Sequence, residues 1–286
     1  MLFNNAFDIQ SERVRIMVIS SRDNPKIKRL AKLISDRKAR AEAGEFVIEG
    51  VRGCIDAAEA FARGEVRLCA LYYVPQTLES CADHLPVGSL LVLPEDMRFE
   101  ITEDIAARIA DTESGQGVFA VVKNVDKPFS GELLRSGGKY LILDGLQDPG
   151  NLGTMLRTAD AVGVDGIVLT GHCVDLYNPK VVRSAVGSLM RVNVCIENDT
   201  DALMSAFADK GIRTAAAVIS GGTSVLDFDF EGGCAVVIGN EGRGLPESHV
   251  AMCSDKVTIG MKGNINSLNA AAAGTILLWE MTRGQK

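Results

Sequence analysis

Residues 141–157 read LILDGLQDPGNLGTMLR, and this stretch decides the fold of the second half of the chain. The apolar run Tyr140–Leu143 has the composition of a strand that is buried on both faces. The turn formers Asp148, Pro149 and Gly150 follow, and the apolar spacing then changes to that of a helix. A strand that turns directly into a helix is the unit of an open α/β sheet, whose ligands bind at the carboxyl edge.

The rest of the second half repeats this alternation. We expect strands over 140–144, 166–170, 192–196, 213–219, 234–239 and 256–259. We expect helices over 151–162, 179–189, 201–208 and 268–282. Because the strands are almost wholly apolar, the pattern predicts a parallel sheet with helices on both faces.

The first half alternates over shorter runs. The spacing of Ile27, Leu30 and Ile34 predicts one amphipathic helix over 24–43, and short strands and helices follow up to residue 123. This alternation predicts a small α/β domain. We therefore expect four segments, namely a disordered extension over 1–17, an α/β substrate domain over 18–125, a linker over 126–138 and a second α/β domain over 139–286. We also expect Met17 to be the true start of the protein.

Composition excludes several classes of protein. The chain has 286 residues, of which 47% are hydrophobic, so it can bury two cores. No run approaches the roughly 18 apolar residues of a membrane span, and the N-terminus lacks the apolar core of a secretion signal. We therefore expect a cytoplasmic protein without membrane contact. The seven cysteines and three histidines show no metal-ligand spacing, which predicts reduced, mostly buried thiols and no metal site.

The charge is unevenly distributed. A net charge of −7 argues against a protein that binds nucleic acid indiscriminately. Residues 22–40 nevertheless hold eight basic residues against two acidic ones. The basic residues are Arg22, Lys26, Lys28, Arg29, Lys32, Arg37, Lys38 and Arg40. This stretch is either the solvated face of a helix or a surface that contacts phosphates.

Two further polar clusters follow apolar runs. Residues 237–246 read VIGNEGRGLP, and glycines after a strand let backbone amides approach a ligand closely. The spacing is neither a dinucleotide fingerprint nor a P-loop. Residues 259–273 read IGMKGNINSLNAAAA, in which a polar loop leads to an alanine-rich helix with Ser267 as its expected N-cap.

In this order, the three clusters resemble the three motifs of the SpoU family of SPOUT RNA methyltransferases. The matches are N-x-G-x-x-x-R at 151–157, I-G-N-E-G-x-G-L-P at 238–246 and S-L-N at 267–269. The resemblance covers about residues 139–286. Gly260 stands where the family usually has proline, and Ala271 stands where it usually has serine.

The first half also resembles a known domain, although fewer residues carry the match. Asn24–Lys26 with the basic helix, and Phe46–Gly50, are similar to the N-terminal RNA-binding domain of many members, an α/β fold of a ribosomal-protein type. Members that modify large-subunit rRNA have this layout, as do members that confer resistance to thiopeptide antibiotics. The resemblance therefore implies RNA as the partner of this chain.

The SpoU resemblance implies a trefoil knot within 139–286, S-adenosyl-L-methionine as cofactor, a ribose 2′-hydroxyl of RNA as methyl acceptor, and a homodimer formed through the C-terminal domain. The implied cofactor contacts are Gly239, Asn240, Gly242, Ile259, Met261 and Leu268. The implied reaction side consists of Asn151, Arg157, Glu241, Ser267 and Asn269. The expected RNA contacts are Lys26, Lys28, Arg29, Lys32 and Arg37.

The family's proposed mechanism uses Arg157 as the base. Because a guanidinium effectively never loses its proton, we expect Arg157 to hold a phosphate bidentately instead. Asn151 is then expected to orient the ribose, and Glu241 or the phosphate to accept the proton. We expect 23S rRNA as the substrate. The alternatives are a tRNA 2′-O-methyltransferase, a catalytically silent RNA-binding protein, and a small-molecule enzyme with a nucleotide cofactor.

Overall fold

A computed structural model describes residues 17–112 and 115–284, which form two compact units. The N-terminal unit comprises the residues up to Ala39 together with Glu45–Lys123, and the C-terminal unit comprises Arg40–Gly44 together with the residues from Asn124 onwards. Of the extension expected over 1–17, residues 1–16 lie outside the described part, whereas Met17 opens a strand.

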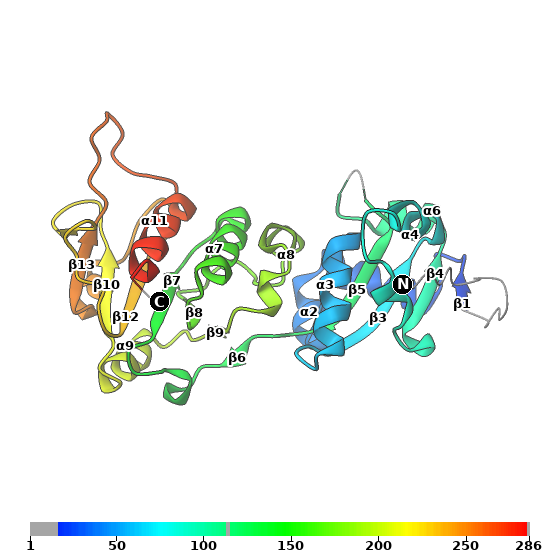
Figure 1. The fold of residues 1–286 in the computed structure, drawn as a ribbon, viewed down its shortest axis with the longest axis horizontal. Coiled ribbons are helices and arrows are strands. Elements are labelled where there is room, and N and C mark those ends of the chain that lie inside the picture. Colours follow the sequence, from blue (N-terminus) through cyan, green and yellow to red (C-terminus); the bar gives the residue numbers. More distant parts are fainter. Residues whose placement is uncertain (1–16, 113–114, 285–286) are drawn as a thin grey trace, which may run out of the picture. The chain divides into compact units, whose positions relative to one another are not determined.

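The N-terminal unit is built on a mixed five-stranded sheet (Figure 1). Its strands are β1 (Met17–Ile19), β2 (Glu45–Glu49), β3 (Leu68–Tyr73), β4 (Arg98–Ile101) and β5 (Val118–Lys123), in the order β1-β4-β3-β5-β2. Strand β5 runs antiparallel to both of its neighbours, whereas β1 and β3 run parallel to β4. Phe46, Leu71 and Phe119, on β2, β3 and β5, are fully buried.

The helices of this unit are α1 (Pro25–Ser35), α3 (Val51–Ala62), α4 (Pro75–Cys81), α5 (Gly88–Leu91) and α6 (Glu103–Ile109). Helix α2 (Arg37–Ala43) begins in this unit, and its residues from Arg40 onwards belong to the C-terminal unit. A 3-10 turn spans Glu95–Met97. The single helix expected over 24–43 is wrong, because Asp36 adopts extended backbone angles (φ −121°, ψ 114°) and ends α1. The Asp36 carboxylate then accepts a hydrogen bond from the Lys38 N–H (2.8 Å), which starts α2.

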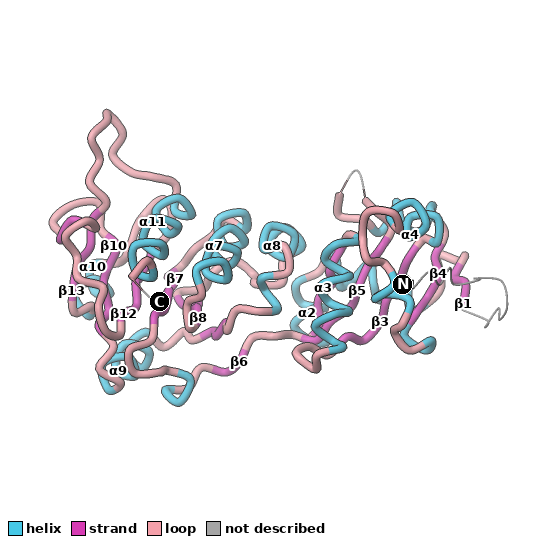
Figure 2. The backbone as a smooth tube through the Cα atoms, viewed as in Figure 1, coloured by secondary structure: helices cyan, strands magenta, loops and turns pink. Residues whose placement is uncertain are grey.

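The C-terminal unit is built on an eight-stranded sheet in which all neighbouring strands are parallel, as the apolar runs predicted. Figure 2 shows strands of this sheet in magenta and its helices in cyan. The strand order is β11-β13-β10-β12-β7-β8-β9-β6. The strands are β6 (Lys127–Pro128), β7 (Lys139–Asp144), β8 (Gly166–Thr170), β9 (Val194–Ile196), β10 (Arg213–Ala217), β11 (Thr223–Ser224), β12 (Cys234–Ile238) and β13 (Asp255–Thr258). The carboxyl ends of these strands therefore share one edge.

Helices cover both faces of this sheet. They are α7 (Pro149–Val162), α8 (Pro179–Ala185), α9 (Thr200–Asp209), α10 (Glu247–Met252) and α11 (Ala270–Thr282), with 3-10 turns at Gly131–Leu133 and Ser188–Met190. In Figure 1, α7, α8 and α11 lie along one side of the sheet and α9 lies on the other. The sequence pattern did not predict α10, and it extended α8 beyond the residue at which it ends.

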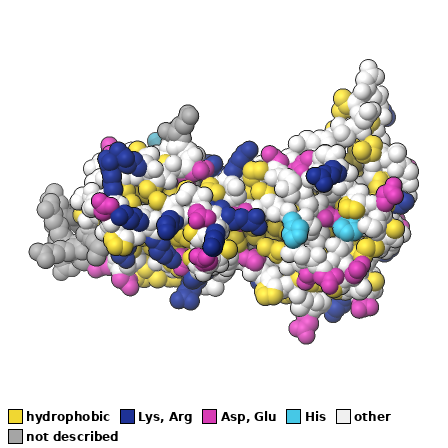
Figure 3. Space-filling view, turned by 180° about the vertical axis from the view of Figure 1, so that it is seen from behind, with side chains coloured by type: hydrophobic (Ala, Val, Ile, Leu, Met, Phe, Trp, Pro, Cys, Tyr) yellow, Lys and Arg dark blue, Asp and Glu magenta, His cyan; other side chains and the backbone are white. Residues whose placement is uncertain are grey.

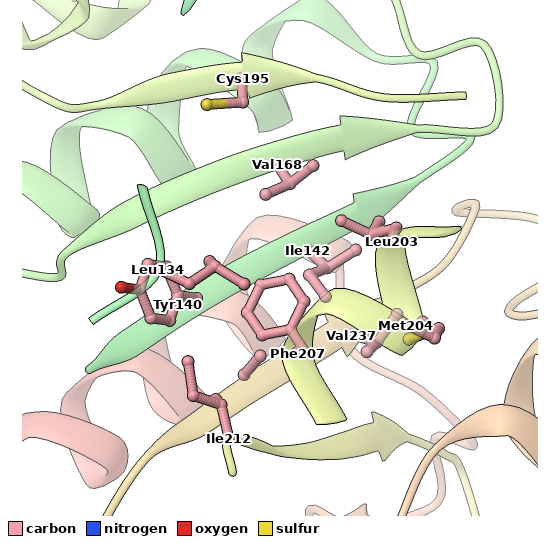
Figure 4. Packing of buried hydrophobic residues seen from close by; sticks show 11 residues of the cluster. Leu134, Tyr140, Ile142, Val168, Cys195, Leu203, Met204, Phe207, Ile212 and Val237 are labelled. Carbon is pink, nitrogen blue, oxygen red and sulfur yellow. The ribbon is translucent and has the colours of Figure 1, made fainter. Parts of the chain in front are cut away.

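The core holds β7 in the middle of the sheet. Phe207 of α9 packs edge-on against Tyr140 of β7, with ring centroids 5.4 Å apart, and Ile142 and Val237 belong to the same buried cluster (Figure 4). Successive residues of a strand face opposite sides, so the apolar run of β7 buries side chains under both helix layers. Burial of each large apolar side chain stabilises the fold by about 1.5–3 kcal/mol. The burial of β7 therefore holds its carboxyl end in a fixed position in the sheet.

Residues 126–138, which we expected as a linker, include β6 and the turn Gly131–Leu133 within the C-terminal unit. Strand β6 pairs with β9 at the sheet edge, where Pro128 can be tolerated although it lacks an N–H group. The backbone N–H groups of Val125 and Asp126 donate to the Tyr177 hydroxyl (2.8 and 2.9 Å). The start of this segment is therefore anchored to the unit that follows it.

Candidate active site

A closed glycine-rich turn follows β12. A Cβ atom at Gly239 would lie 2.3–2.5 Å from backbone atoms of Gly244 and Leu245, so only glycine allows this approach. Two backbone hydrogen bonds join Asn240 and Gly244 (3.1 and 2.8 Å). The Asn240 side-chain oxygen also accepts from the Gly242 and Arg243 N–H groups (3.0 and 3.1 Å). The turn is therefore held in one shape from inside.

Glu241 lies at the tip of this turn and connects it to the first motif. Its carboxylate accepts hydrogen bonds from the N–H groups of Gln147 (3.1 Å) and Asp148 (2.8 Å) and from the Asn151 amide (3.1 Å). Partial burial raises the pKa of Glu241, but these hydrogen bonds and one from its own backbone outweigh burial and hold the pKa below its ordinary value. The carboxylate is therefore ionised at neutral pH and is a weak base.

The third motif joins the same network through Asn269. Its amide donates to the Asn151 side-chain oxygen (2.9 Å), while its own oxygen accepts from the Ala271 and Ala272 N–H groups (2.9 and 3.3 Å). Asn269 is thus the N-cap of α11. The expectation that Ser267 caps this helix is wrong, because the chain turns helical only at Ala270.

The three motifs, far apart in the sequence, are therefore linked by side chains in the order Glu241, Asn151, Asn269. Asn151 is buried, so its amide needs both of these partners. Polar groups that satisfy one another in this way hold a single arrangement. The network lies where the parallel strands end, which is the edge that the strand-to-helix turn indicated.

A pocket of about 270 Å³ lies beside the glycine-rich turn. Of the residues expected at the site, it is lined by Gly239, Asn240, Glu241, Gly242, Ile259, Met261, Ser267 and Leu268. Its walls combine backbone amides with apolar side chains such as Val218, Ile238 and Leu277. This combination suits an adenosyl group, because apolar walls accept the flat face of a purine and backbone groups meet its polar edge.

Part of this pocket comes from residues that the three motifs did not indicate. Ala217, Val218 and Ile219, at the end of β10, line it, as do Arg243 and Asn266. Strand β10 lies between β12 and β13, so its carboxyl end lies between the second and third motifs. The pattern of apolar runs placed β10 correctly, but strand order was needed to bring its end to the site.

Arg157 lies outside both the pocket and the hydrogen-bond network. It is exposed on α7, about two turns after Asn151. Its guanidinium makes no hydrogen bond or ion pair with any residue of 17–112 or 115–284. An unpaired guanidinium that faces solvent is available to a ligand that carries negative charge.

The basic residues of α1 differ in what they contact. Lys26 lies over the Phe99 ring (4.3 Å to the centroid), Lys28 pairs with Asp23 (2.7 Å), and Arg29 pairs with Glu45. Figure 3 shows Lys and Arg gathered over one face of this unit, with Asp and Glu among them. The next two basic residues are exposed, and within the described residues neither Lys32 nor Arg37 has a side-chain partner.

Glu45 explains why Arg29 is less available than its neighbours. Its side chain is only 7% exposed and also pairs with Lys123 (2.9 Å). Burial raises the pKa of Glu45, but hydrogen bonds from Lys123 and Arg29 outweigh this and bring the pKa below its ordinary value. Arg29 therefore compensates a buried negative charge within the unit.

No helix of residues 17–112 and 115–284 has the length and apolar character that a membrane span requires. In those ranges, no three His, Cys, Asp or Glu side chains lie together as metal ligands would. All seven cysteines are free, and burial raises the pKa of Cys54 and raises that of Cys234 to about 11. Neither of these two thiols is thus a ready nucleophile.

Two protein families match separate parts of this chain. The SpoU rRNA Methylase family matches residues 138–279, and the MRM3-like substrate binding domain matches residues 24–120. A 23S rRNA uridine 2′-O-methyltransferase from Streptomyces viridochromogenes is 31% identical over 93% of this chain and 91% of its own. A 23S rRNA guanosine 2′-O-methyltransferase from Bacillus subtilis is 28% identical over 92% of this chain and 98% of its own.

A solved rRNA methyltransferase structure has a similar fold. The crystal structure of an AdoMet-bound rRNA methyltransferase from Sinorhizobium meliloti matches with a TM-score of 0.79 at 28% identity. That match covers 94% of this chain and 98% of the other. Both the family resemblance and the α/β fold class expected from the sequence are confirmed. The chain belongs to the SpoU rRNA methylase family of SPOUT methyltransferases.

Proposed function

We propose that this protein transfers a methyl group from S-adenosyl-L-methionine to a ribose 2′-hydroxyl of 23S rRNA. One observation carries the proposal: the three motifs are joined through Glu241, Asn151 and Asn269 beside a pocket that suits an adenosyl group. Two relatives that align with almost the whole chain are named as 23S rRNA 2′-O-methyltransferases. They are named for different bases, so the shared chemistry is that of the ribose.

The cofactor is S-adenosyl-L-methionine, and when bound it supplies an electrophilic methyl group on a sulfonium. Backbone groups of Gly239, Ile259 and Leu268 would hold its adenosyl part, with Asn240, Gly242 and Met261 close by. Gly239 brings the backbone of the turn close enough for these contacts. Most of the binding energy then comes from groups that folding has already placed, which lowers the cost of ordering on binding.

The reaction requires a ribose oxygen to be held in line with the methyl group, and placement alone can contribute about 7–11 kcal/mol. We assign that placement to Asn151 and Ser267 on the cofactor side and to Arg157 on the phosphate side. Because the pKa of Glu241 is lowered, its carboxylate is poorly suited to accept the ribose proton. Glu241 and Asn269 therefore act as positioning residues. A phosphodiester oxygen is a weaker base still, so Arg157 would hold its phosphate only to place the ribose, and the hydroxyl proton would leave to solvent as the new O–C bond forms.

The test is a transfer assay with tritiated cofactor and three RNA pools: 23S rRNA, 16S rRNA and tRNA. We expect label in 23S rRNA within an alkali-resistant dinucleotide, since a 2′-O-methyl group blocks hydrolysis of the adjacent phosphodiester. Label confined to tRNA would support the tRNA alternative. Cofactor binding by calorimetry without transfer to any pool would support the catalytically silent RNA-binding protein.

Residues 18–125 are proposed as the domain that selects the RNA, residues 126–138 as the connection and residues 139–286 as the methyltransferase domain. Lys32 and Arg37 support this, because both are exposed cations without a partner in the described part of the chain. The match to a substrate binding domain family covers most of the same range. Since ribosomal RNA is the proposed substrate, the cytoplasm is the proposed location.

A homodimer through α11 is also proposed. This helix is apolar on nearly all sides, and Trp279 is 60% exposed although it lies between Leu278 and the buried Met281. A helix that is apolar all round is ordinarily covered. A second copy is the proposed cover, and sedimentation should give twice the 30.5 kDa mass. Trp279→Glu should shift the protein to monomer, and a wild type that sediments as monomer at micromolar concentration would refute the proposal.

A further inference from the structure

Lys180 occupies a position that the stability of its own helix does not explain. Helix α8 begins with Asn178, whose side-chain oxygen accepts from the Lys180 N–H (2.9 Å), and with Pro179 in its first turn. No acidic residue is present in this first turn. A positive charge there is unfavourable, because the free N–H groups already make the start of a helix electropositive.

Tight packing of α8 on α7 determines where Lys180 lies. A Cβ atom at Gly153 would lie 2.3 Å from the Ser184 Cβ and 2.9 Å from the Val181 carbonyl oxygen, so the helices cross in contact at this glycine. One turn earlier on each helix lie Gly150 and Lys180, whose Cε lies 3.9 Å from the Cβ position of Gly150. Lys180 is thus placed beside the first turn of α7.

That turn carries the reaction side of the site, because Gly150 immediately precedes Asn151. Arg157 follows Gly150 by seven residues, so it lies on the same side of α7 and about 10 Å further along. Lys180 and Arg157 are both exposed, and neither side chain has a partner within residues 17–112 and 115–284. Two unpaired cations therefore lie along one side of α7, Lys180 beside the first turn, which carries Asn151, and Arg157 about two turns further on.

We propose that Lys180 binds a phosphate of the RNA strand whose ribose is methylated, as a positioning residue next to the site. The inference rests on the proposed function. An RNA strand presents phosphates at regular spacing, so a strand held by Arg157 has a further phosphate for a second cation along α7. Lysine suits this contact because its ammonium acts as a point charge without a required orientation.

The test compares Lys180→Ala and Lys180→Arg with Lys210→Ala. Lys210 is a matched control, since it is exposed, follows α9 and precedes β10, which places it at the amino edge of the same sheet. Transfer to a 23S rRNA fragment is measured over a range of salt concentrations. Lys180→Ala should raise KM for RNA about tenfold with kcat nearly unchanged, and Lys180→Arg should restore most of the loss.

The salt dependence distinguishes a phosphate contact from a general weakening. Removal of one contact should reduce the slope of log(kcat/KM) against log salt by about one, and Lys210→Ala should leave it unchanged. Because the first-turn charge is removed, the Tm of Lys180→Ala should equal or exceed that of wild type. Equal slopes and equal KM for Lys180→Ala and Lys210→Ala would overturn the inference, as would loss of cofactor binding in Lys180→Ala.

The inference and the proposed function can fail separately. If wild type transfers no methyl group to RNA, the proposed function fails. RNA affinity can then be measured by fluorescence anisotropy without cofactor. The slope of log affinity against log salt is compared between wild type, Lys180→Ala and Lys210→Ala. A wild-type slope that Lys180→Ala does not reduce in that measurement would overturn the inference by itself.

Discussion

Helices α1 and α8 begin with the same three residues in two different units. Asn24–Lys26 and Asn178–Lys180 both read Asn-Pro-Lys, and each asparagine accepts from the lysine N–H at 2.9 Å. Their backbone angles agree closely, with φ −56° and ψ 128° in α1 against φ −57° and ψ 132° in α8. The first lysine lies over the Phe99 ring, whereas the second lies beside Gly150 without a described partner. Identical local structure thus gives one packed cation and one available cation.

The carboxylates of the two units differ in a related way. Glu45 is held by two cations, Arg29 and Lys123, whereas Glu241 is held by N–H groups of Gln147, Asp148 and Asn151. Cations neutralise a charge, but N–H groups orient it and leave the net charge in place. The C-terminal unit has two unpaired cations next to its site, Arg157 and Lys180. In the N-terminal unit, most of the cations on α1 contact other residues of the same unit.

The largest expected effect comes from Gly153→Ala, which disturbs the start of α8 relative to α7 but leaves α1 unchanged. The added methyl group would overlap Ser184 and the Val181 backbone, so we expect a loss of about 1–3 kcal/mol in unfolding free energy. Methyl transfer should fall more than a hundredfold, because a shift of α7 would move Asn151 away from Glu241 and Asn269 as well as from Lys180. Urea unfolding and the transfer assay measure both effects.

Gly88→Ala is the control for this substitution, since Gly88 lies in the N-terminal unit and no atom lies within 4 Å of the Cβ that the substitution adds. It should behave as wild type in both measurements. If Gly153→Ala were as stable and active as this control, the α7–α8 contact would have no part in positioning Lys180.

The next effect concerns Glu241→Gln, which replaces an oxygen that faces N–H donors with an NH₂ group. We expect kcat to fall about thirtyfold to a hundredfold while RNA affinity stays within twofold. Because the folded pKa is lowered, the carboxylate stabilises the fold above the unfolded pKa and loses this effect as pH falls through the folded pKa.

The difference in Tm between wild type and Glu241→Gln should therefore be present at pH 7 and should shrink below about pH 4. Melting curves at both pH values provide the measurement. A difference that is equal at pH 7 and pH 3.5 would contradict the role of the ionised carboxylate.

Arg29→Ala tests the N-terminal side of the comparison. It removes one of two cations from the buried Glu45, so we expect a loss of about 1–2 kcal/mol in unfolding free energy. Lys32→Ala should leave stability unchanged and weaken RNA binding several-fold, because Lys32 has no partner among the described residues. Denaturation measures the stability of each variant, and fluorescence anisotropy measures its RNA binding. If Arg29→Ala weakened RNA binding and Lys32→Ala lowered stability, the pairing of Arg29 would not limit its contact with RNA.

Removal of either helix cap, Asn24 or Asn178, should lower the stability of the protein by nearly the same amount. Asn24→Ala and Asn178→Ala each remove one side-chain acceptor from the first turn, which should lower stability by about 1 kcal/mol. Only Asn178→Ala should also raise KM for RNA, since it loosens the turn that carries Lys180. A rise in KM of equal size in both variants would show that the two helix starts do not differ in function.

The smallest expected effect is that of Lys26→Ala. Loss of its contact with the Phe99 ring at an exposed position should cost about 0.5 kcal/mol. Lys180→Ala should cost no stability at all. Thermal melts of the two variants measured together provide the comparison, and a larger loss of Tm in Lys180→Ala would mean that this side chain has a structural role.

Much of the fold could be predicted from apolar runs alone. Strands such as β7 and β12 are continuous apolar segments because helices cover both faces of the sheet, and such segments are distinctive in a sequence. The break at Asp36 was missed because a polar residue on the outer face interrupts no apolar spacing. The cap at Asn269 was misplaced by two residues because Ser267 and Asn269 have similar capping preferences.

The site, like the fold, could be predicted only in part. The three motifs could be found because each follows a strand, and all parallel strands end at one edge. The contributions of Gln147 and of the end of β10 to the site could not be predicted. They depend on which strands are neighbours in the sheet. Strand order is decided by packing between distant segments, on which the spacing of apolar residues carries no information.

The two Asn-Pro-Lys helix starts show this division most directly. The sequence by itself determines each start, because a short side-chain acceptor reaches an N–H group two residues further on, whatever surrounds it. Only the tertiary structure decides what each lysine meets. Lys180 reaches the first turn of α7 because α8 packs tightly on Gly153, and this contact between distant segments forms only when the chain has folded.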